Sequence, residues 1–331
     1  MYGAFQDGSS YQQNDKFDVI STTTLTLEPI KDVLKISGDF TYKAIRSTQV
    51  RISDIQTGYV AEESYNTSSY KSDWRYNTDH LASNIVLTWT PKLGDNHNLN
   101  VMGGWNIEKT KYRRLYLQRK GLLYASIPSF ELMDSDEYSV EDDGYDRSMV
   151  GVFGRINYTL LNRYIFEFAA RYDGSSRFPS NQRWGFFPSG SIGWRLSEEP
   201  WMTWSRNWLD NFKIRANVGS LGNANVSDYS FMDLMSVARS GIVINGAKQP
   251  YTMSPTSLTW ETVTTYDIGL DMDFLRNRLS FSGDYYWRYT NDMLINGPDY
   301  PELLGADSPK GNYGSLKTKG WEASLSWRDS F

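Results

Sequence analysis

The chain has 331 residues with a formal net charge of −5, and 15% of the residues are aromatic. The aromatic content argues against a disordered protein, and the weakly acidic charge argues against nucleic-acid binding, which usually needs a basic patch. The absence of cysteine excludes a disulfide scaffold, a zinc site with cysteine ligands and a thiol nucleophile. No apolar run approaches the length of about 18 residues that a membrane-spanning helix needs, but strands of a membrane barrel expose only alternate residues to lipid.

Apolar and polar residues alternate with a period of two along most of the chain, which is typical of strands with two different faces. The pattern predicts about eleven strands, each near the roughly 10 residues that a tilted strand needs to cross a bilayer. In the clearest strand, 266–274, apolar residues alternate with Asp267, Gly269, Asp271 and Asp273. In chain order the strands are expected at 17–28, 34–43, 84–89, 98–107, 150–159, 164–172, 185–196, 212–220, 266–274, 279–289 and 320–327.

The connections between these strands differ in length according to their order. After odd-numbered strands they are mostly short, at 29–33, 91–97, 161–163 and 275–278, and the longer exception, 197–211, is rich in tryptophan and a candidate for a short helix. After even-numbered strands they are longer, at 47–80, 113–148, 174–184, 223–262 and 294–319. Outer-membrane barrels have this asymmetry, with short periplasmic turns and long extracellular loops.

Aromatic residues gather near the ends of the expected strands, where amphipathic rings favour the boundary between lipid and water. These residues are Trp89, Tyr112, Tyr158, Tyr164, Tyr172, Trp194, Trp287, Tyr289 and Trp327. The alternative is a soluble all-β protein, in which the apolar face is a core and the charged face meets solvent. Loop parity, strand length and aromatic positions agree with one another and favour the membrane barrel.

Several segments resemble the barrel of the SusC/RagA family, the TonB-dependent transporters of Bacteroidetes outer membranes. The longest begins at Phe153 and reads FGRINYTLLNRYIFEFAARYDGSSRFPSNQRWGFFPSGSIGWRLSEEPWM. Three later segments are similar to the strands that follow: KIRANVGSLGN from Lys213, TWETVTTYDIGLDMDFLRNRLSFSGDYYWRYTNDML from Thr259 and GNYGSLKTKGWEASLSWRD from Gly311. The resemblance is dense in the second half of the chain and loose in the first, and the order and spacing of the segments make it specific.

The resemblance implies an all-β fold in which residues 1–331 are an antiparallel transmembrane β-barrel segment. It would supply about eleven strands of a roughly 22-stranded barrel, without the plug or the remaining strands. It also implies a Gram-negative outer membrane, contact with membrane lipid, and uptake of oligosaccharides (glycans) or peptides. The implied partners are a SusD-like surface lipoprotein and, through a missing N-terminal part, the TonB complex.

Two other functions fit a barrel, namely a surface-exposed structural or adhesive protein and a passive porin. An upstream plug and TonB box would separate the importer from both. The N-terminus has neither the basic nor the apolar region of a secretory signal peptide, and the C-terminus stops directly after a strand-like pattern. Both ends of the chain are therefore expected to lie inside a longer protein.

Aromatic side chains in the expected extracellular loops or on the lumen face are the candidate ligand-binding residues. An aromatic ring packs against the apolar face of a sugar, whereas carboxylates accept hydrogen bonds from its hydroxyls. The candidates are Tyr70, Trp74, Tyr76, Tyr138, Tyr145, Trp184 and Trp260. Packing within the loops or contact with a partner protein is the alternative for each of them.

An acidic cluster between residues 134 and 143 is a candidate Ca²⁺ site, because Ca²⁺ prefers oxygen ligands. Its members are Asp134, Asp136, Glu137, Glu141, Asp142 and Asp143. The spacing is not that of an EF-hand, and a solvated acidic loop is the alternative. No other cofactor is expected.

No arrangement of nucleophile, base and orienting group is visible, so the chain is not expected to be an enzyme and no catalytic residue is predicted. His80 and His97 fall in or beside connections on opposite sides, and neither a G-x-S-x-G elbow nor a phosphate-binding glycine loop occurs. The charged residues expected on the lumen face should form pairs between strands or contact the plug. They include Arg155, Glu167, Arg171, Asp271, Asp273 and Arg288.

Overall fold

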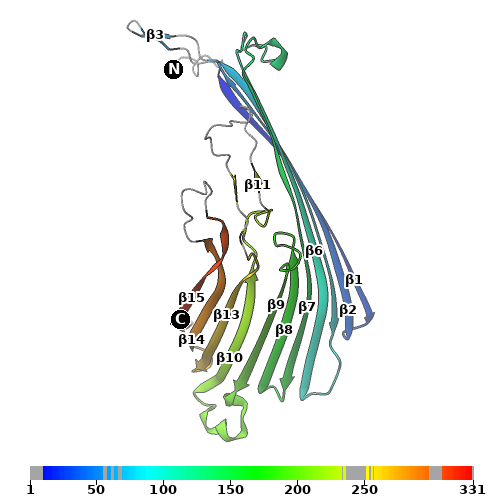
Figure 1. The fold of residues 1–331 in the computed structure, drawn as a ribbon. Helices are drawn as coiled ribbons and strands as arrows, with labels where there is room; N and C mark the ends of the chain where they lie inside the picture. Colours follow the sequence, from blue (N-terminus) through cyan, green and yellow to red (C-terminus); the bar gives the residue numbers. More distant parts are fainter. Residues whose placement is uncertain are drawn as a thin grey trace. The chain divides into compact units, whose positions relative to one another are not determined.

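In the computed structural model, eleven strands form one sheet in the order β1-β2-β5-β6-β7-β8-β9-β10-β13-β14-β15 (Figure 1). The strands are β1 (Tyr11–Ile30), β2 (Leu34–Ser53), β5 (Tyr70–Trp89), β6 (His97–Lys120), β7 (Tyr138–Leu160), β8 (Tyr164–Ser175), β9 (Trp184–Arg195), β10 (Leu209–Asn223), β13 (Glu261–Phe274), β14 (Leu279–Asn296) and β15 (Lys310–Trp327). The structure describes residues 10–54, 58–60, 63–65, 69–124, 126–232, 234–235, 251–252, 255, 257–297 and 308–329. The predicted all-β, antiparallel fold is confirmed.

The remaining elements are short. Two hairpins pair β3 (Gly58–Val60) with β4 (Glu63–Tyr65) and β11 (Leu234–Met235) with β12 (Tyr251–Thr252). The described residues also form the 3-10 turns η1 (Phe130–Leu132), η2 (Leu196–Glu198) and η3 (Pro200–Ser205). In the part of the chain that the structure describes, no helix has the length and apolar character needed to cross a membrane.

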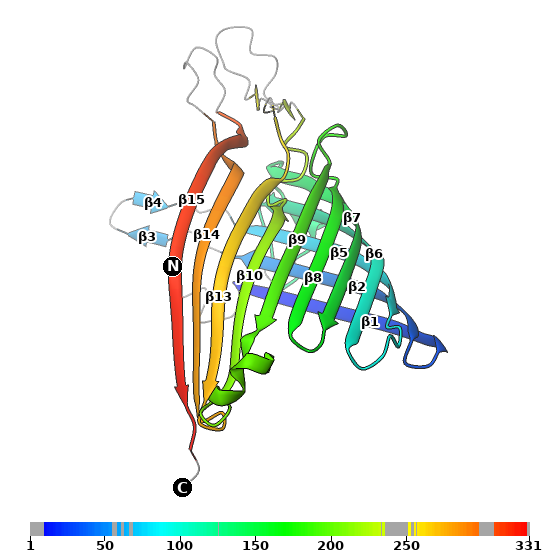
Figure 2. The same cartoon turned by 90° about the horizontal axis from the view of Figure 1, so that it is seen from below.

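The chain forms two compact units. The first comprises residues 1–23, 40–83 and 108–147, and the second comprises 24–39, 84–107 and 148–331. Within the second unit, β13, β14 and β15 run side by side (Figure 2).

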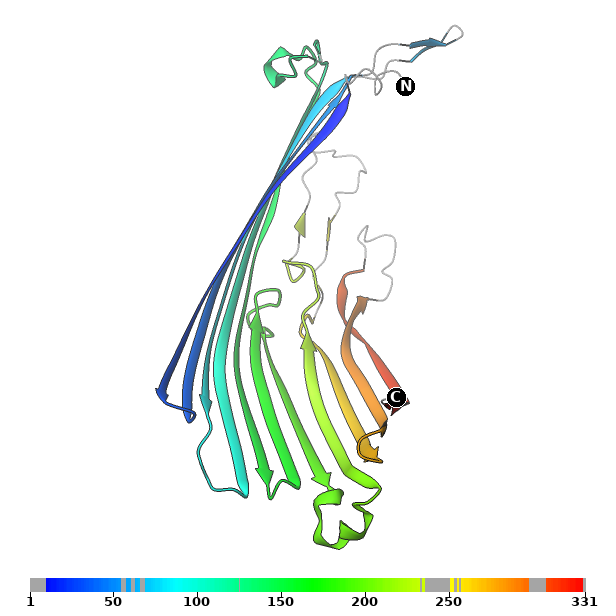
Figure 3. The same cartoon turned by 180° about the vertical axis from the view of Figure 1, so that it is seen from behind.

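All links after odd-numbered strands of the sheet belong to the second unit, and Figure 3 shows them at one end of its strands. Most of these links are short, and the longer 196–208 carries η2 and η3, as the tryptophan-rich segment predicted. Between β7 and β8, Leu161 and Asn162 both have positive φ, and the N–H of Arg163 donates to the carbonyl of Leu160. This geometry is that of a type I′ hairpin turn, whose twist matches that of the flanking strands. The predicted parity of the links is confirmed.

Most strands are longer than the sequence predicted, and β15 for example starts at Lys310 rather than at residue 320. β2 extends to Ser53, β5 starts at Tyr70, β6 extends to Lys120 and β7 starts at Tyr138. The links that were expected at 47–80 and 113–148 therefore shrink to 54–69 and 121–137. The prediction used the length of a bilayer crossing, but a barrel strand can continue into water, where its apolar alternation fades.

The first unit contains a small core of Ile52, Leu122 and Met133, against which Val50 and Phe130 pack. The link after β6 folds over this core because it is hydrogen-bonded to the residue that precedes β5. The N–H of Gly121 donates to the carbonyl of Ser69, and the N–H of Leu122 donates to the Ser69 hydroxyl. This link is therefore an ordered cap on the strands of its own unit.

The exposure of apolar side chains on one face of the second unit distinguishes a membrane barrel from a soluble protein. Phe168, Ile192 and Ile268 are 53%, 58% and 52% exposed on one face. A soluble sandwich would bury such residues in its core, whereas a membrane barrel presents them to lipid. The exposure supports the predicted assignment of this face to the outside of the wall.

Candidate functional site on the polar face

The polar face of the second unit carries a charged network centred on Arg215. The register places Arg215 of β10 opposite Gly269 of β13, and Gly269 opposite Asp284 of β14. The Arg215 guanidinium donates to Asp284 through Nη2 at 2.8 Å and to Asp271 through Nε at 3.2 Å. A longer contact of 3.4 Å joins its Nη1 to Asp267, which also accepts from the Asn217 amide at 2.8 Å.

Glycine at position 269 makes this geometry possible. A Cβ atom there would lie 2.6 Å from the Arg215 Cζ atom and would also meet the Asp284 carboxylate. The guanidinium therefore crosses the backbone of β13 through the space that the missing side chain leaves. A glycine inside a strand often marks such a close approach.

We expect Gly269→Ala to lower the free energy of unfolding by about 1–3 kcal/mol, because the added methyl group overpacks the network. The matched control is Gly154→Ala in β7, where a Cβ would meet only the Met102 carbonyl oxygen at an ordinary 3.7 Å. Urea unfolding of the two full-length variants in detergent measures the difference. Equal midpoints for the two variants would contradict the packing argument.

A second network of the same design lies around Arg171 in β8. The Arg171 Nη2 donates to Asp173 at 2.8 Å and to the side-chain oxygen of Asn106 at 3.1 Å. A Cβ at Gly151 of β7 would lie 2.8 Å from the same Nη2 atom. Here too a guanidinium crosses a neighbouring strand at a glycine.

The predicted pairing of lumen-facing charges is confirmed in part. Arg155 and Glu167 form a pair between β7 and β8 at 2.8 Å, and Asp271 contacts Arg215 across strands. Asp273 accepts instead from the Asn211 amide at 3.1 Å, and the ion pair of Arg171 is with Asp173 of its own strand. The fixed pairs and the excess of carboxylates around Arg215 give this face a structured, negatively charged surface.

A wall with exposed apolar residues on one face and ion-pair networks on the other is the geometry of a membrane barrel, and comparison with known proteins identifies which one. The family model described as "TonB dependent receptor-like, beta-barrel" matches residues 2–331. The chain belongs to the TonB-dependent receptor family. The chain accordingly lies in the outer membrane, and its family consists of transporters and receptors rather than enzymes.

Two curated relatives show which members of the family are similar. The barrel is 33% identical over 258 residues to TonB-dependent receptor P3 of Formosa agariphila, covering 76% of this chain and 25% of that protein. It is 32% identical over 285 residues to TonB-dependent receptor SusC of Bacteroides thetaiotaomicron, covering 82% of this chain and 27% of SusC. The chain thus spans about a quarter of the length of these relatives and is SusC-like, as its motifs indicated.

Solved structures show the same fold. The structure of the RagAB peptide transporter aligns with 98% of this chain and 36% of the matched chain, with a TM-score of 0.86 and 21% identity. The siderophore receptor PiuA from Acinetobacter baumannii aligns with 96% of this chain and 44% of its own, with a TM-score of 0.54 and 14% identity. The strand arrangement is therefore that of a TonB-dependent barrel.

The candidate ligand residues of the first unit lie on strands, not in loops. Tyr70, Trp74 and Tyr76 belong to β5, and Tyr138 and Tyr145 belong to β7. Their expected loop positions are wrong, because both strands extend beyond the bilayer crossing. A role of these residues in ligand binding stays a prediction.

Two of these first-unit rings stack on other aromatic rings. Trp74 stacks on Tyr116 with 4.8 Å between ring centroids, and Tyr145 stacks on Tyr112 at 5.1 Å. Tyr138 is 58% exposed and presents the most accessible ring of the set. Because β6 continues to Lys120, Tyr112 does not lie at a strand end, and its place in an interfacial aromatic belt stays a prediction.

The two candidates in the second unit have contrasting environments. Trp260 is 6% exposed and packs against Phe178 and Phe187, while its Nε1 donates to the carbonyl of Arg183 at 2.9 Å. Trp184 is 47% exposed and stacks on Tyr172 at 5.0 Å. Packing therefore accounts for Trp260, whereas Trp184 lies on the same face of β9 as Ile192, and its role in ligand binding stays a prediction.

Three of the acidic candidates pair with basic side chains, Glu137 with Lys120 and the other two with Arg114. Glu141 accepts from Arg114 at 3.0 Å, and Asp143 lies 4.0 Å from the same guanidinium. Within the described ranges, no three acidic, histidine or cysteine side chains gather as ligands for a metal ion. The Ca²⁺ site at Asp134, Asp136, Glu141, Asp142 and Asp143 stays a prediction, and the structure offers no grouping that supports it.

The two histidines have hydroxyl partners. The His80 Nδ1 lies 3.0 Å from the Thr110 hydroxyl, and the His97 Nδ1 lies 2.7 Å from the Tyr158 hydroxyl. His80 falls inside β5, so its expected place in or beside a connection is wrong. Each ring is engaged in its own unit by a neighbouring strand.

Sequence reasoning missed Glu199, which joins the link after β9 to the barrel. Its buried carboxylate accepts from the Trp194 Nε1 at 2.9 Å and the Tyr164 hydroxyl at 2.7 Å, and it pairs with Arg163 at 3.3 Å. These hydrogen bonds hold the pKa of the Glu199 carboxyl below its ordinary value, and the hydrogen bond from Trp194 has the largest effect. The motif GWRLSEEP, quoted above only for its family resemblance, contains both Trp194 and Glu199.

The lowered pKa predicts an acid-sensitive link. The stabilisation is complete above the unfolded pKa of about 4.3 and is lost as the pH falls through the lower folded value. We therefore expect the thermal midpoint of the full-length protein to fall more between pH 6 and pH 3 in the wild type than in Glu199→Gln. Parallel midpoints over this range would contradict the role of the carboxylate.

Proposed function

We propose that this chain forms part of the barrel wall of an energised outer-membrane importer that takes up oligosaccharides or peptides. The supporting observation is that β13 has an exposed apolar face and an opposite face of charged residues. Ile268 is 52% exposed on the apolar side, while Asp267 and Asp271 on the other side enter the Arg215 network. A strand of this kind separates hydrocarbon from a polar passage.

Two kinds of observation support the proposed classes of substrate. The fold likeness to the RagAB peptide transporter favours peptides, and the negatively charged surroundings of Arg215 suit the basic groups of a peptide. The resemblance of the chain to the SusC/RagA family adds oligosaccharides, and the 32% identity to SusC supports that resemblance. In this proposal a SusD-like surface lipoprotein delivers the substrate and the TonB complex supplies energy.

The test is uptake by cells that carry the full-length parent protein. Cells are given fluorescent oligosaccharide or peptide mixtures, with and without a protonophore, and a deletion strain is the baseline. We expect uptake that requires the protein and that stops when the proton gradient is dissipated. Uptake that persists with the protonophore would indicate a passive porin, and uptake equal to that of the deletion strain would favour a structural or adhesive role.

A further inference from the structure

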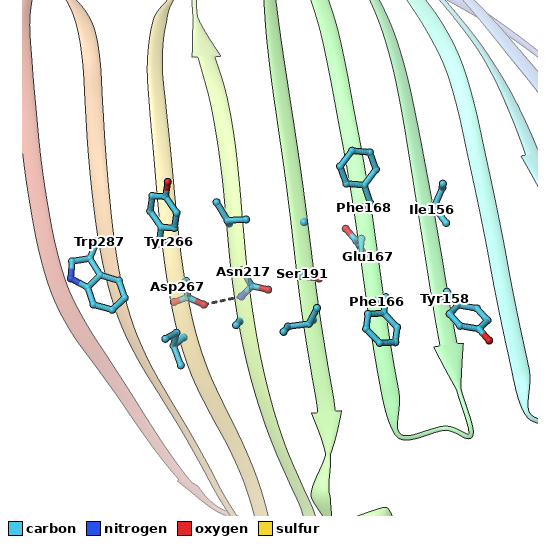
Figure 4. A pocket seen from close by; sticks show the side chains of 15 residues that line it. Ile156, Tyr158, Phe166, Glu167, Phe168, Ser191, Asn217, Tyr266, Asp267 and Trp287 are labelled. Carbon is cyan, nitrogen blue, oxygen red and sulfur yellow. Dashed lines mark hydrogen bonds between the residues drawn. The ribbon is translucent and has the colours of Figure 1, made fainter.

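A shallow groove runs along the apolar face of the second unit, on the side of the wall away from the Arg215 network. It encloses about 770 Å³ and is lined almost entirely by carbon. Figure 4 shows Phe166 and Phe168 on one side of it and Tyr266 and Trp287 on the other. The volume lies within the range of about 300–1,000 Å³ that is typical of small-molecule sites.

The groove exists because small residues interrupt two rows of large ones. One row across the sheet pairs Phe168 with Gly190, and continues through Val218 to Tyr266. In this row the wall has no side chain at Gly190 of β9. The next row runs from Phe166 through Ile192 to Ala216 of β10, whose small side chain again leaves space on this face. Gly190 and Ala216 are diagonal neighbours on adjacent strands, so the spaces beside them join into one channel.

The channel continues to the end of the strands that carries the short links. A second hollow of about 340 Å³ shares Phe166, Ile192 and Ala216 with the first and is also lined by Tyr164 and Trp194. The polar atoms of these two rings are bonded to Glu199 in the link after β9. The apolar channel thus begins at a pair of interfacial aromatic residues on the side of the short, periplasmic links.

The opposite end of the channel is polar. There a hollow that shares Tyr266 and Trp287 with the groove is also lined by Thr264, Tyr289 and Asn291. A flexible hydrocarbon chain that enters the channel at the periplasmic end therefore contacts apolar side chains until it reaches these polar residues. The channel lies on the face that the family and the exposed side chains assign to lipid.

We propose that this groove holds one acyl chain of a phospholipid from the periplasmic leaflet of the outer membrane. Because bulk lipid is as apolar as the groove, the hydrophobic effect does not favour the bound chain, and only closer packing does. About ten additional carbon–carbon contacts would give an approximately tenfold preference over a flat wall. The proposal concerns the outer surface and does not depend on the identity of the imported substrate.

Two glycines on the same face allow a matched test. A Cβ at Gly190 would meet only the Glu167 carbonyl oxygen at 3.7 Å, and a Cβ at Gly154 would meet only the Met102 carbonyl oxygen at 3.7 Å. Only Gly190 lines the groove. Gly190→Phe should therefore fill the channel, whereas Gly154→Phe adds the same ring to the same face outside it. Gly190→Leu serves as a smaller filling variant if the phenylalanine variant does not fold.

The experiment is native mass spectrometry of the full-length protein extracted in a mild detergent and incubated with dioleoyl phosphatidylethanolamine. We expect the wild type and Gly154→Phe to retain one phospholipid, and Gly190→Phe or Gly190→Leu to retain about tenfold less. Equal retention by all variants would overturn the proposal. A retained mass of lipopolysaccharide, or a dimer that only the Gly190 variants disrupt, would also overturn it by assigning the groove to another occupant.

Discussion

Replacing Arg215 with methionine should lower the free energy of unfolding of the full-length barrel by about 2–4 kcal/mol. The change leaves Asp267, Asp271 and Asp284 facing one another without their shared cation. Removing one partner of a buried ion pair costs about 3–5 kcal/mol, and the value is reduced here because the four side chains keep some contact with water. Urea titration in detergent or lipid vesicles measures the change.

Two further variants separate the network from a general loss of charge. Arg288→Met removes an exposed guanidinium of β14 that makes a 3.4 Å contact with Thr265 and lies 5.6 Å from the centre of the Tyr286 ring, and it should cost no more than about 1 kcal/mol. Adding Asp284→Asn to Arg215→Met should recover part of the loss, because it removes one of the unpaired carboxylates. Equal costs for the two arginine variants, or no recovery in the double variant, would reject the network as a unit.

Replacing Ile268 with arginine should lower the free energy of unfolding in a bilayer by about 2–4 kcal/mol. Ile268 lies near the middle of β13 on the apolar face, and a charge near the bilayer midplane must leave water to reach that position. Asp271→Asn on the opposite face should cost much less. It removes one of the three carboxylates around a single guanidinium, so the remaining two still hold Arg215.

Folding titrations in vesicles of defined lipid test this difference. If Ile268→Arg and Asp271→Asn have equal costs, the assignment of the two faces is wrong. A repeat in detergent adds a control, because the penalty for arginine should shrink where water reaches the outer surface more easily.

Alternation and link length were enough to predict the central part of each strand and the short links of the second unit. The same signal underestimated the length of β5 and β7. Residues such as Trp74 and Tyr145 follow no apolar alternation, since that part of the strand has no lipid-facing side to maintain. Pairing with the neighbouring strand keeps these residues extended, and a single sequence does not display that pairing.

The Arg215 network depends on register, which a single sequence specifies weakly. Arg215 and its aspartates are separated by the link between β10 and β13, so nothing near Arg215 in the chain indicates its partners. The available signal was the run of Asp267, Asp271 and Asp273 on one face of β13, which demands a cation on a neighbouring strand. Glycine at 269 then marks the position where that cation crosses.

Trp260 and Glu199 illustrate the limit of reading residues by type. A tryptophan in an extracellular link was a reasonable candidate for a sugar-binding ring, yet Trp260 is buried between Phe178 and Phe187. The alternation would place Phe187 on the polar face of β9, where an apolar cluster was not expected. The sequence analysis did not single out Glu199, and only the structure places Tyr164 and Trp194 around it.

The central claim is that β13 separates lipid from a water-filled passage. The chain has no cysteine, so single cysteines at positions 266–274 can carry spin labels in a full-length protein that lacks other thiols. In lipid vesicles we predict that collisions with oxygen peak at the even positions and collisions with a water-soluble nickel chelate peak at the odd positions. Accessibility without this alternation, or with the opposite phase, would contradict the account.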